Sequence, residues 1–452
     1  MEKVYTVRNL KYNIYQLLLV GFMLLLATQT LGLVCYNLLP NVKPILLDKA
    51  GANARQISLI LATLPQAIGF FLCPLISTIS DKTRSRIGRR MPYLIYSAPI
   101  LAILLVMIAY YQEITDFINR VVPSFANING ELWVLAVLML VFQVVFLFPG
   151  SVVYYLVADV IPKNFIGRYT AVATICSSAI GAGFNFFLLK VSVENTKLTF
   201  AIMGILYLAV YILLLLTVKE GEYPPVNDEI DRSKSSLVRG VEYFTLFFKE
   251  CFGHRIYVLL FLSTGLNQAS NICRGMYNVL FATKDIGVSV ELYGKIMGIG
   301  SIIAMVAVFF MGKLMDKFHP MFLYIYGGIL IIITNIFGYY FVYTPLTFGV
   351  IGIVTALMYA IQGVAGTPLL VNMLPMDKFG QFASANSMVN SVVVILGAYL
   401  GGYLTDLFGY RVMFIWDFAV TSIAMTAMLL VYLQWKKLGG RNYIPPQRKV
   451  MD

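Results

Sequence analysis

The sequence predicts an all-α integral membrane protein with twelve transmembrane helices in two six-helix bundles. Three observations support this prediction. Hydrophobic residues make up 59% of the 452 residues and charged residues 12%, and a soluble fold could not bury that much apolar surface. Twelve apolar stretches are long enough, or nearly so, to cross about 30 Å of hydrocarbon. The longest polar stretch lies between the sixth and the seventh of them.

The twelve spans are expected to be helices. A backbone exposed to lipid must satisfy its own hydrogen bonds, and the strands of a barrel would alternate polar with apolar residues. The predicted spans are residues 17–39, 57–79, 93–112, 131–157, 169–190, 198–218, 256–282, 291–312, 320–343, 346–371, 381–405 and 411–435.

The polar stretch 219–255 is expected to be a cytoplasmic linker between the bundles. Its second part carries Leu237, Val241, Phe244 and Phe248 at helical spacing, which predicts an amphipathic helix on the inner membrane face. A linker helix without membrane contact is the alternative. The predicted domains are an N-terminal bundle at 1–218, the linker at 219–255, a C-terminal bundle at 256–435 and a cytoplasmic tail at 436–452.

The distribution of basic residues predicts the orientation. With the N-terminus inside, the inner segments hold 24 Lys and Arg residues and the outer loops hold nine. The positive-inside rule then places both termini in the cytoplasm. The net charge of +12 therefore reflects topology, and no nucleic-acid partner is expected. We expect a multi-pass protein of the plasma (inner) membrane, without a cleavable signal and with five cysteines too scattered for a disulfide framework.

Several kinds of chemistry are not expected. Both histidines, His254 and His319, lie in inner loops, so no Ser-His pair or metal centre can form within the membrane. The sequence lacks a GxxxxGK[ST] phosphate-binding loop, so transport driven by ATP hydrolysis is not expected from this chain. We expect no cofactor, no metal and no enzymatic activity. A sensor of the same fold would carry an appended signalling segment, and the tail 436–452 is short and basic.

The two halves of the chain share sequence features at matching places. Spans two and eight end in Asp-Lys, and spans four and ten are followed by a proline, a glycine five residues later, a polar residue and an aromatic residue. The matching segments are Asp81-Lys82 with Asp316-Lys317, and Pro162…Gly167-Arg168-Tyr169 with Pro375…Gly380-Gln381-Phe382. A six-helix unit used twice explains both coincidences.

Two motifs carry a resemblance to a known family. They are Asp81-Lys-Thr-Arg-Ser-Arg-Ile-Gly-Arg-Arg-Met-Pro-Tyr93 and Val157-Ala-Asp159-Val-Ile-Pro162. The chain resembles the major facilitator superfamily over nearly its whole length, and within it the glycoside–pentoside–hexuronide cation symporters and sucrose carriers. The resemblance implies the major facilitator fold and a secondary transporter that moves a sugar or glycoside by alternating access. The expected partners are a small-molecule substrate, H⁺ or Na⁺ as coupling ion, and membrane lipids, and a monomer is expected.

The basic segment at residues 80–92 is the candidate inner gate. In the superfamily an aspartate at the position of Asp81 faces a helix N-terminus of the other half, where the helix dipole favours a carboxylate. The arginines after it can bridge to Asp159 and Asp377 when the inner side closes. The alternative is that they only fix the topology and bind lipid headgroups. The candidate gate residues are Asp81, Arg84, Arg86, Arg89, Arg168, Asp316 and Lys317.

Span seven carries a polar stripe. Asn267, Asn271, Arg274 and Asn278 recur at i, i+4, i+7 and i+11, on one face of a helix. An arginine at the centre of a membrane helix costs about 2.5–3.5 kcal/mol, so the stripe is expected to face other helices or a wet cavity. Amides and a guanidinium suit the hydroxyls of a sugar. The alternative is a structural hydrogen-bond network between helices.

Arg274 requires a counter-charge. Asp417 of span twelve is a carboxylate clearly inside the membrane, at a matching depth. We therefore expect Arg274 and Asp417 to pair. An Arg274 without a partner would instead suit an anionic ligand such as a uronide.

The first half has amides where the second has charges. Gln29, Gln66 and Gln143 lie near the midpoints of spans one, two and four, and the first six spans contain no interior carboxylate. By the resemblance, Gln143 stands where sucrose carriers place an aspartate, and a glutamine cannot take up and release a proton. Ion coupling would then need Asp417 or Asp159. Otherwise the protein is an uncoupled facilitator or an exporter of a related small solute, an anionic one included. The candidate substrate-binding residues are Asn267, Asn271, Arg274, Asn278, Gln29, Gln66, Gln143, and Asn386 and Asn390 of span eleven.

Overall fold

The computed structural model describes residues 5–7, 9–83, 85, 87–123, 129–221, 247–315, 318–375 and 378–446. Packing divides the chain into two compact units, which are described separately. Unit 1 comprises Met1–Val226 and Val288–Ile302, and unit 2 comprises Asn227–Gly287 and Ile303–Asp452.

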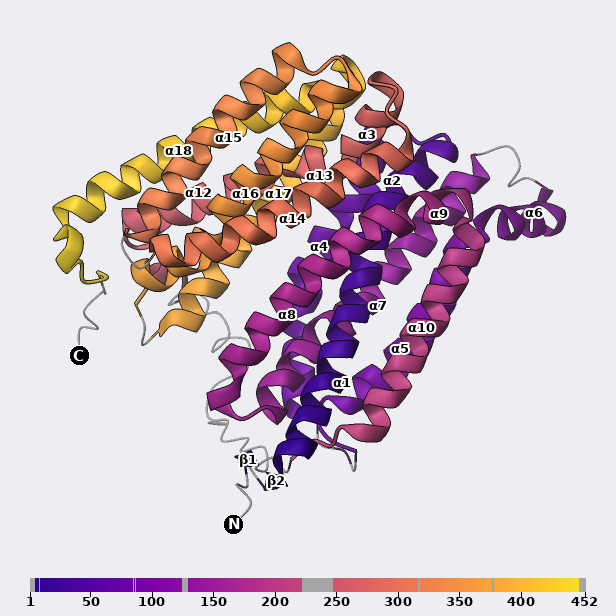
Figure 1. Ribbon diagram of the computed structural model, residues 1–452, viewed down its shortest axis with the longest axis horizontal. Coiled ribbons are helices and arrows are strands. Elements are labelled where there is room, and N and C mark those ends of the chain that lie inside the picture. The colour runs from indigo at the N-terminus through magenta and orange to yellow at the C-terminus, as the bar shows by residue number, and fades with distance from the viewer. Residues whose placement is uncertain are drawn as a thin grey trace. The chain divides into compact units, whose positions relative to one another are not determined.

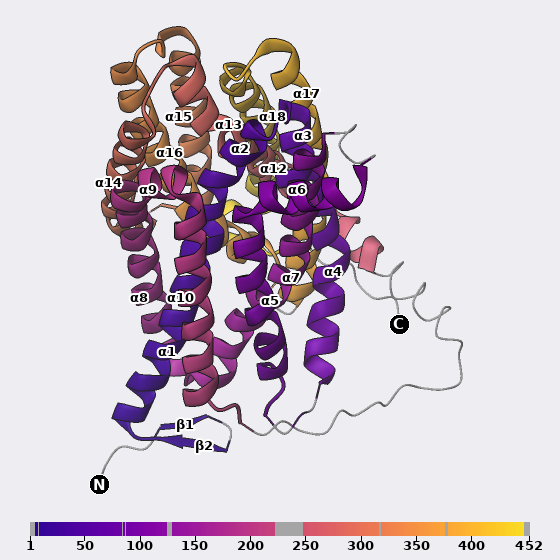
Figure 2. The same cartoon turned by 90° about the vertical axis from the view of Figure 1, so that its right-hand side faces the viewer.

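Unit 1 is a bundle of long helices with a small β-hairpin at one end (Figure 1). Its elements are β1 (Tyr5–Val7), β2 (Leu10–Tyr12), α1 (Ile14–Gly32), η1 (Leu33–Leu38), α2 (Leu39–Lys49), α3 (Ala54–Ser58), η2 (Leu59–Thr63), α4 (Leu64–Lys82), α5 (Met91–Ala109), α6 (Tyr111–Val121), α7 (Gly130–Val160), α8 (Lys163–Gly183), η4 (Phe184–Leu188), α9 (Leu189–Glu194) and α10 (Thr196–Thr217). The antiparallel hairpin, which was not predicted from the sequence, lies beside the start of α1 (Figure 2).

Unit 2 is a second helical bundle. Its elements are α12 (Arg255–Ser270), α13 (Ile272–Leu280), η5 (Phe281–Asp285), α15 (Pro320–Phe341), α16 (Pro345–Met373), α17 (Phe379–Phe408), α18 (Val412–Lys437) and η7 (Gly440–Asn442). Helix α14 (Val290–Met315) begins in unit 1 and ends in unit 2.

The predicted all-α membrane fold is confirmed. In the described part of the chain, eleven helices are long and apolar enough to cross a membrane. The seventh predicted span, 256–282, is present as α12 and α13, because regular helix is interrupted at Asn271. The two pieces, of 16 and nine residues, are each shorter than the roughly 20 residues that a spanning helix needs. The interruption explains why eleven continuous helices stand where twelve spans were predicted.

Equivalent helix pairs pack together in both units. In unit 1 the third long helix, α5, packs against the fourth, α7, and the sixth, α10, while α1 also packs against α10. In unit 2 the corresponding helices repeat these contacts: α15 packs against α16 and α18, and α12 against α18. The pattern supports a six-helix unit used twice.

Large apolar side chains cover the outside of the bundles. Phe71, Ile205 and Leu216 are 73%, 70% and 74% exposed, which would be costly over so many positions in water. In a membrane the same side chains contact lipid. The helices are accordingly apolar on nearly all sides, as expected for spans.

The described end of the linker, residues 247–252, is helical and is held to unit 2. Glu250 accepts hydrogen bonds from Lys378 Nζ and Gln381 Nε2, both at 2.8 Å. The bond from Lys378 lowers the pKa of Glu250 below its usual value, although partial burial opposes this shift. Most of the predicted amphipathic helix lies outside the described residues.

We predict that Gly327→Ala destabilises unit 2. Gly327 of α15 faces α16, and an added Cβ would lie 2.9 Å from the Cβ of Gln362 and 3.1 Å from its Cα. Because backbone would have to move, the cost should be about 1–3 kcal/mol. The thermal unfolding midpoint of the purified protein in detergent measures it. The matched control is Gly363→Ala in α16, where no atom lies within 4 Å and the midpoint should hold or rise. Equal midpoints in the two variants would contradict the prediction.

Candidate functional site

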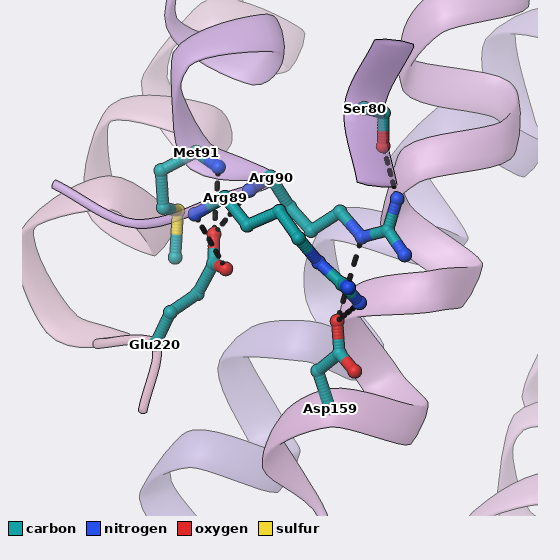
Figure 3. A network of polar contacts seen from close by, with 6 residues as sticks. All are labelled: Ser80, Arg89, Arg90, Met91, Asp159 and Glu220. Atoms are coloured by element: carbon teal, nitrogen blue, oxygen red, sulfur yellow. Dashed lines mark hydrogen bonds and ion pairs between the residues drawn. The ribbon is translucent and has the colours of Figure 1, made fainter. Parts of the chain in front are cut away.

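The first polar network lies where α4 ends and α5 begins, called here the basic end of unit 1 (Figure 3). Glu220, which follows α10, reaches the first turn of α5. Its Oε1 accepts hydrogen bonds from the backbone N–H groups of Arg90 and Met91, both at 2.7 Å, and its Oε2 accepts from that of Arg89 at 2.9 Å. Such N–H groups have no partner within their own helix, and the helix dipole favours a carboxylate beside them. Glu220 therefore caps α5 from a distant part of the chain.

Gly88 makes room for this cap. Its φ of +120° lies in a region that side chains with a Cβ rarely adopt. An added Cβ would also lie 2.7 Å from the carboxylate carbon of Glu220. Both the backbone conformation and the space available therefore require glycine at position 88.

Two arginines of the same segment bind Asp159, at the end of α7 (Figure 3). Arg89 Nη2 lies 3.0 Å and Arg90 Nε 3.4 Å from Asp159 Oδ2. Arg90 also donates to Ser80 Oγ and lies over the ring of Tyr155, 4.8 Å from its centroid. The bridge that the sequence suggested between Arg89 and Asp159 is thus present, within unit 1. Arg90 was not among the candidates.

Among the other gate candidates, Arg168 is exposed and lies over Phe165, 5.8 Å from the ring centroid. Phe165 is in turn in edge contact with Tyr5 of the hairpin. The remaining candidates, or their side chains, lie outside the described residues: Asp81, Arg84, Arg86, Asp316, Lys317 and Asp377.

The second network joins α1 to α8 in unit 1. Gln29 Nε2 donates to the carbonyl oxygen of Ala173 at 3.1 Å, and Ser177 Oγ donates to Gln29 Oε1 at 2.8 Å. Gln29 is buried, with 8% of its surface exposed. The pair lines a cavity of about 360 Å³ between α1, η1, α7 and α8. The other predicted glutamines do not line it: Gln66 is exposed and Gln143 is partly buried in α7.

The third network is the ion pair of unit 2. Nε of Arg274, in α13, lies 3.1 Å from Oδ2 of Asp417, in α18, so the contact expected from the sequence is formed. Arg274 Nη2 also donates to Asn335 Oδ1 of α15 at 2.6 Å, and Tyr359 OH of α16 donates to Asp417 Oδ1 at 2.5 Å. Asp417 is fully buried. Side chains from four helices therefore meet at one pair whose charges neutralise each other.

The polar stripe of span seven does not lie on one continuous helix. Asn271 stands at the interruption and is exposed, whereas Arg274 is largely buried. Asn278 is partly buried. The Oδ1 atom of Asn267 is buried and has no hydrogen-bond partner in the described part of the chain. The helix on which this single polar face was predicted is therefore interrupted at Asn271.

A fourth cluster joins α12 to α17. Thr264 Oγ1 lies 2.6 Å from Asn386 Oδ1, 3.2 Å from Asn390 Oδ1 and 3.1 Å from the carbonyl oxygen of Phe261. A hydroxyl has one proton, so it can donate to only one of these oxygens. Both asparagines are buried, with 5% and 8% of their surface exposed. Thr264 therefore satisfies at most one of the two asparagine oxygens, and neither Nδ2 group has a partner in the described residues.

Sequence reasoning missed several members of these networks. Asn335 and Tyr359 carried a signal, since polar side chains within a span usually bind another helix. Glu220 gave a weaker one, an acid directly after a span. Ser177 and Thr264 gave none, because serine and threonine hydroxyls commonly bond to the carbonyls of their own helix.

Comparison with known protein families gives one match. A model of the Major Facilitator Superfamily matches residues 185–344 and 260–449. A search of curated protein sequences finds no significant match.

Solved structures show the same fold at low identity. A bacterial homolog of the human lysosomal transporter Spinster, inward-facing and occupied, has a TM-score of 0.68 at 14% identity, over 94% of this chain and 97% of that one. A mutant of the nucleoside transporter NupG has a TM-score of 0.65 at 14% identity, over 92% and 100%. A D-xylose-proton symporter has a TM-score of 0.59 at 14% identity, over 96% and 99%.

We predict that Glu220→Gln destabilises the basic end of unit 1. The change removes the charge that three backbone N–H groups share, and bonds to charged groups are worth about 1.5–3 kcal/mol. The thermal midpoint in detergent should fall. Glu113→Gln is the matched control, because the Glu113–Lys197 pair is about half exposed and such pairs contribute little. Equal shifts in the two variants would show that Glu220 does not stabilise the start of α5.

We predict that Asp417→Asn costs about 3–5 kcal/mol, because it leaves the Arg274 charge unpaired in a low-dielectric interior. Arg274→Met combined with Asp417→Leu removes both charges and should recover part of that loss. Thermal midpoints of Arg274→Met, of Asp417→Leu and of the double variant test this. A double variant as unstable as the sum of the two single changes would rule out charge pairing as the main interaction.

Proposed function

Because the family model matches residues 185–449, which is more than half of the 452 residues of this chain, the chain belongs to the Major Facilitator Superfamily, and we propose that it moves a sugar or glycoside across the membrane by alternating access. The family is one of transporters, and the protein is a multi-pass membrane protein. Two of the similar structures are named as transporters of D-xylose and of nucleosides, and both kinds of solute contain a sugar ring.

The observation that carries the substrate class is the chemistry of the polar side chains inside the two units. In unit 1, Gln29 and Ser177 are uncharged and line a cavity. In unit 2, Thr264, Asn386 and Asn390 are also uncharged, and both asparagines keep part of an amide without a partner among the described residues. Amides and hydroxyls both donate and accept hydrogen bonds, as sugar hydroxyls require.

The proposed topology places both termini in the cytoplasm and the protein in the plasma (inner) membrane, since the basic end of unit 1 should face inward. We propose two bundles, 1–218 and 256–435, that move relative to each other, with 219–255 as linker. In this scheme Asp81, Arg89 and Asp159 belong to an inner gate. Arg89 already has Asp159 as its partner, and changes in such contacts are what separate two states of a transporter.

Ion coupling distinguishes two forms of the proposal. H⁺ or Na⁺ symport would use Asp417, or Asp159 at the basic end. A specific observation favours the second candidate, an uncoupled facilitator: Asp417 is fully buried and bound by Arg274 and Tyr359, and span four carries Gln143 in place of an acid. The charge of Arg274 is already paired with Asp417, which disfavours a role in binding an anionic solute.

The test is counterflow in proteoliposomes with labelled monosaccharides, glycosides and uronides, repeated under imposed proton and sodium gradients. We expect exchange of at least one neutral sugar or glycoside. Accumulation driven by one gradient would identify the symporter and its ion, whereas exchange that is indifferent to both would identify the facilitator. Liposomes with protein inserted but no exchange of any neutral compound would reject the sugar class.

A further inference from the structure

We propose that the cavity between α1 and α8 is a binding subsite for one uncharged, polyhydroxylated ring of monosaccharide size, and that Gln29 and Ser177 recognise its hydroxyls. The inference rests on the proposed function and adds to it the location of the binding site and the size and charge of the ligand. The volume of about 360 Å³ lies near the lower end of the range of small-molecule sites, about 300–1,000 Å³. It suits a single ring.

The charge of the ligand follows from the lining. The described residues around the cavity include no acidic or basic side chain. An anion placed here would find no basic side chain to pair with among the described lining residues. The lining therefore favours a neutral solute over a uronide.

The hydrogen-bond groups of the lining match a hydroxyl. Gln29 uses one N–H on Ala173, and its second N–H has no partner in the described residues. Thr170 and Thr174 of α8 donate to the carbonyls of Ile166 and Thr170, which leaves their oxygens able to accept. A sugar hydroxyl donates one bond and accepts two. The cavity thus offers both kinds of group within one turn of α8 and the facing side of α1.

Two aromatic rings complete the lining. Tyr36 and Tyr169 both border the cavity, and Tyr36 is 58% exposed. Tyr36 is also fixed by edge contact with Phe146, 6.3 Å between centroids. An aromatic ring with a polar tip can cover the apolar C–H face of a sugar ring and still hydrogen-bond at its edge.

The α1–α8 contact has a counterpart in the other half. Ala173 and Ser177 lie 11 and 15 residues after Pro162, and Asn386 and Asn390 lie 11 and 15 residues after Pro375. In unit 1 both positions of the fifth helix contact Gln29 of the first helix. In unit 2 both contact Thr264 of the first helix of that half. A polar contact kept at two equivalent positions of a repeat is a feature of the six-helix unit and not a local accident.

A cavity-filling variant tests the subsite. Gly32 lines the cavity, and an added Cβ would meet only Tyr36 Cδ2, at 3.9 Å. Gly32→Leu should therefore fold and occupy the space. Gly21→Leu, on the same helix with no atom within 4 Å of its Cβ and away from the cavity, is the matched control. The measurement is equilibrium binding of labelled D-glucose, D-galactose, D-xylose and D-glucuronate to the purified protein in detergent.

We expect the wild-type protein to bind at least one neutral sugar and not D-glucuronate. Gly32→Leu should reduce that binding at least about 50-fold, a loss of roughly 2 kcal/mol or more, and Gly21→Leu should leave it unchanged. Ser177→Ala should weaken binding about three- to tenfold, as for loss of one hydrogen bond. Ser178→Ala should not, because Ser178 bonds to Thr174 of its own helix and does not line the cavity. Binding of a matching deoxy-sugar should be affected less by Ser177→Ala than binding of the parent sugar.

The outcomes separate this inference from the proposed function. If wild-type liposomes exchange a neutral sugar and Gly32→Leu binds it as the wild type does, the subsite is rejected and the transporter stands. Binding of D-glucuronate in preference to the neutral sugars rejects the charge assignment. No binding of any neutral sugar, with no counterflow, rejects both.

Discussion

The structure depends on one constraint: lipid offers no hydrogen-bond partner, so a polar group inside the membrane must find one within the chain or line a cavity that water or a solute can enter. Arg274 shows what this requires. Its guanidinium is bound by Asp417 and Asn335, and Asp417 is bound in turn by Tyr359. The four side chains come from α13, α15, α16 and α18. The charge of Arg274 therefore constrains how these four helices are rotated relative to one another. A rotation that separated the partners would leave a buried group unsatisfied at a cost of several kcal/mol.

The same constraint acts at the ends of helices. The first N–H groups of α5 have no partner in their own helix, and Glu220 supplies one from 129–131 positions away in sequence. The cap works only because Gly88 turns the chain with a positive φ and leaves space for the carboxylate. Arg89 and Arg90 then place their positive charges on Asp159. The basic segment is thus fixed on two sides by acids of its own unit.

The two halves keep one architecture and differ in chemistry. Both place a polar side chain of the first helix against equivalent positions of the fifth, Gln29 against Ser177 and Thr264 against Asn390. Unit 1 adds a cavity without charged side chains among its described lining, and unit 2 adds a buried ion pair. The cavity that we propose to bind neutral hydroxyls therefore belongs to unit 1. The ion pair of unit 2 is then either a structural contact between helices or a group that changes state during transport.

The sequence by itself determined the features that depend on composition and local spacing. Apolar runs predicted the spans, because crossing a membrane needs about 20 apolar residues in a row, and matching motifs predicted the repeat. The Arg274–Asp417 contact was also predictable, since few carboxylates exist at that depth and an unpaired charge there is costly.

Tertiary structure alone decided the rest. The interruption at Asn271 divides a span that was predicted as one helix, and Glu220, Asn335 and Tyr359 meet their partners only once helices have packed at particular rotations. The cavity beside Gln29 likewise exists because α1 and α8 lie at one distance and one angle. The hydropathy of a segment predicts that it lies in the membrane, but it contains little information on how the helix is rotated about its axis. That rotation determines which polar groups meet.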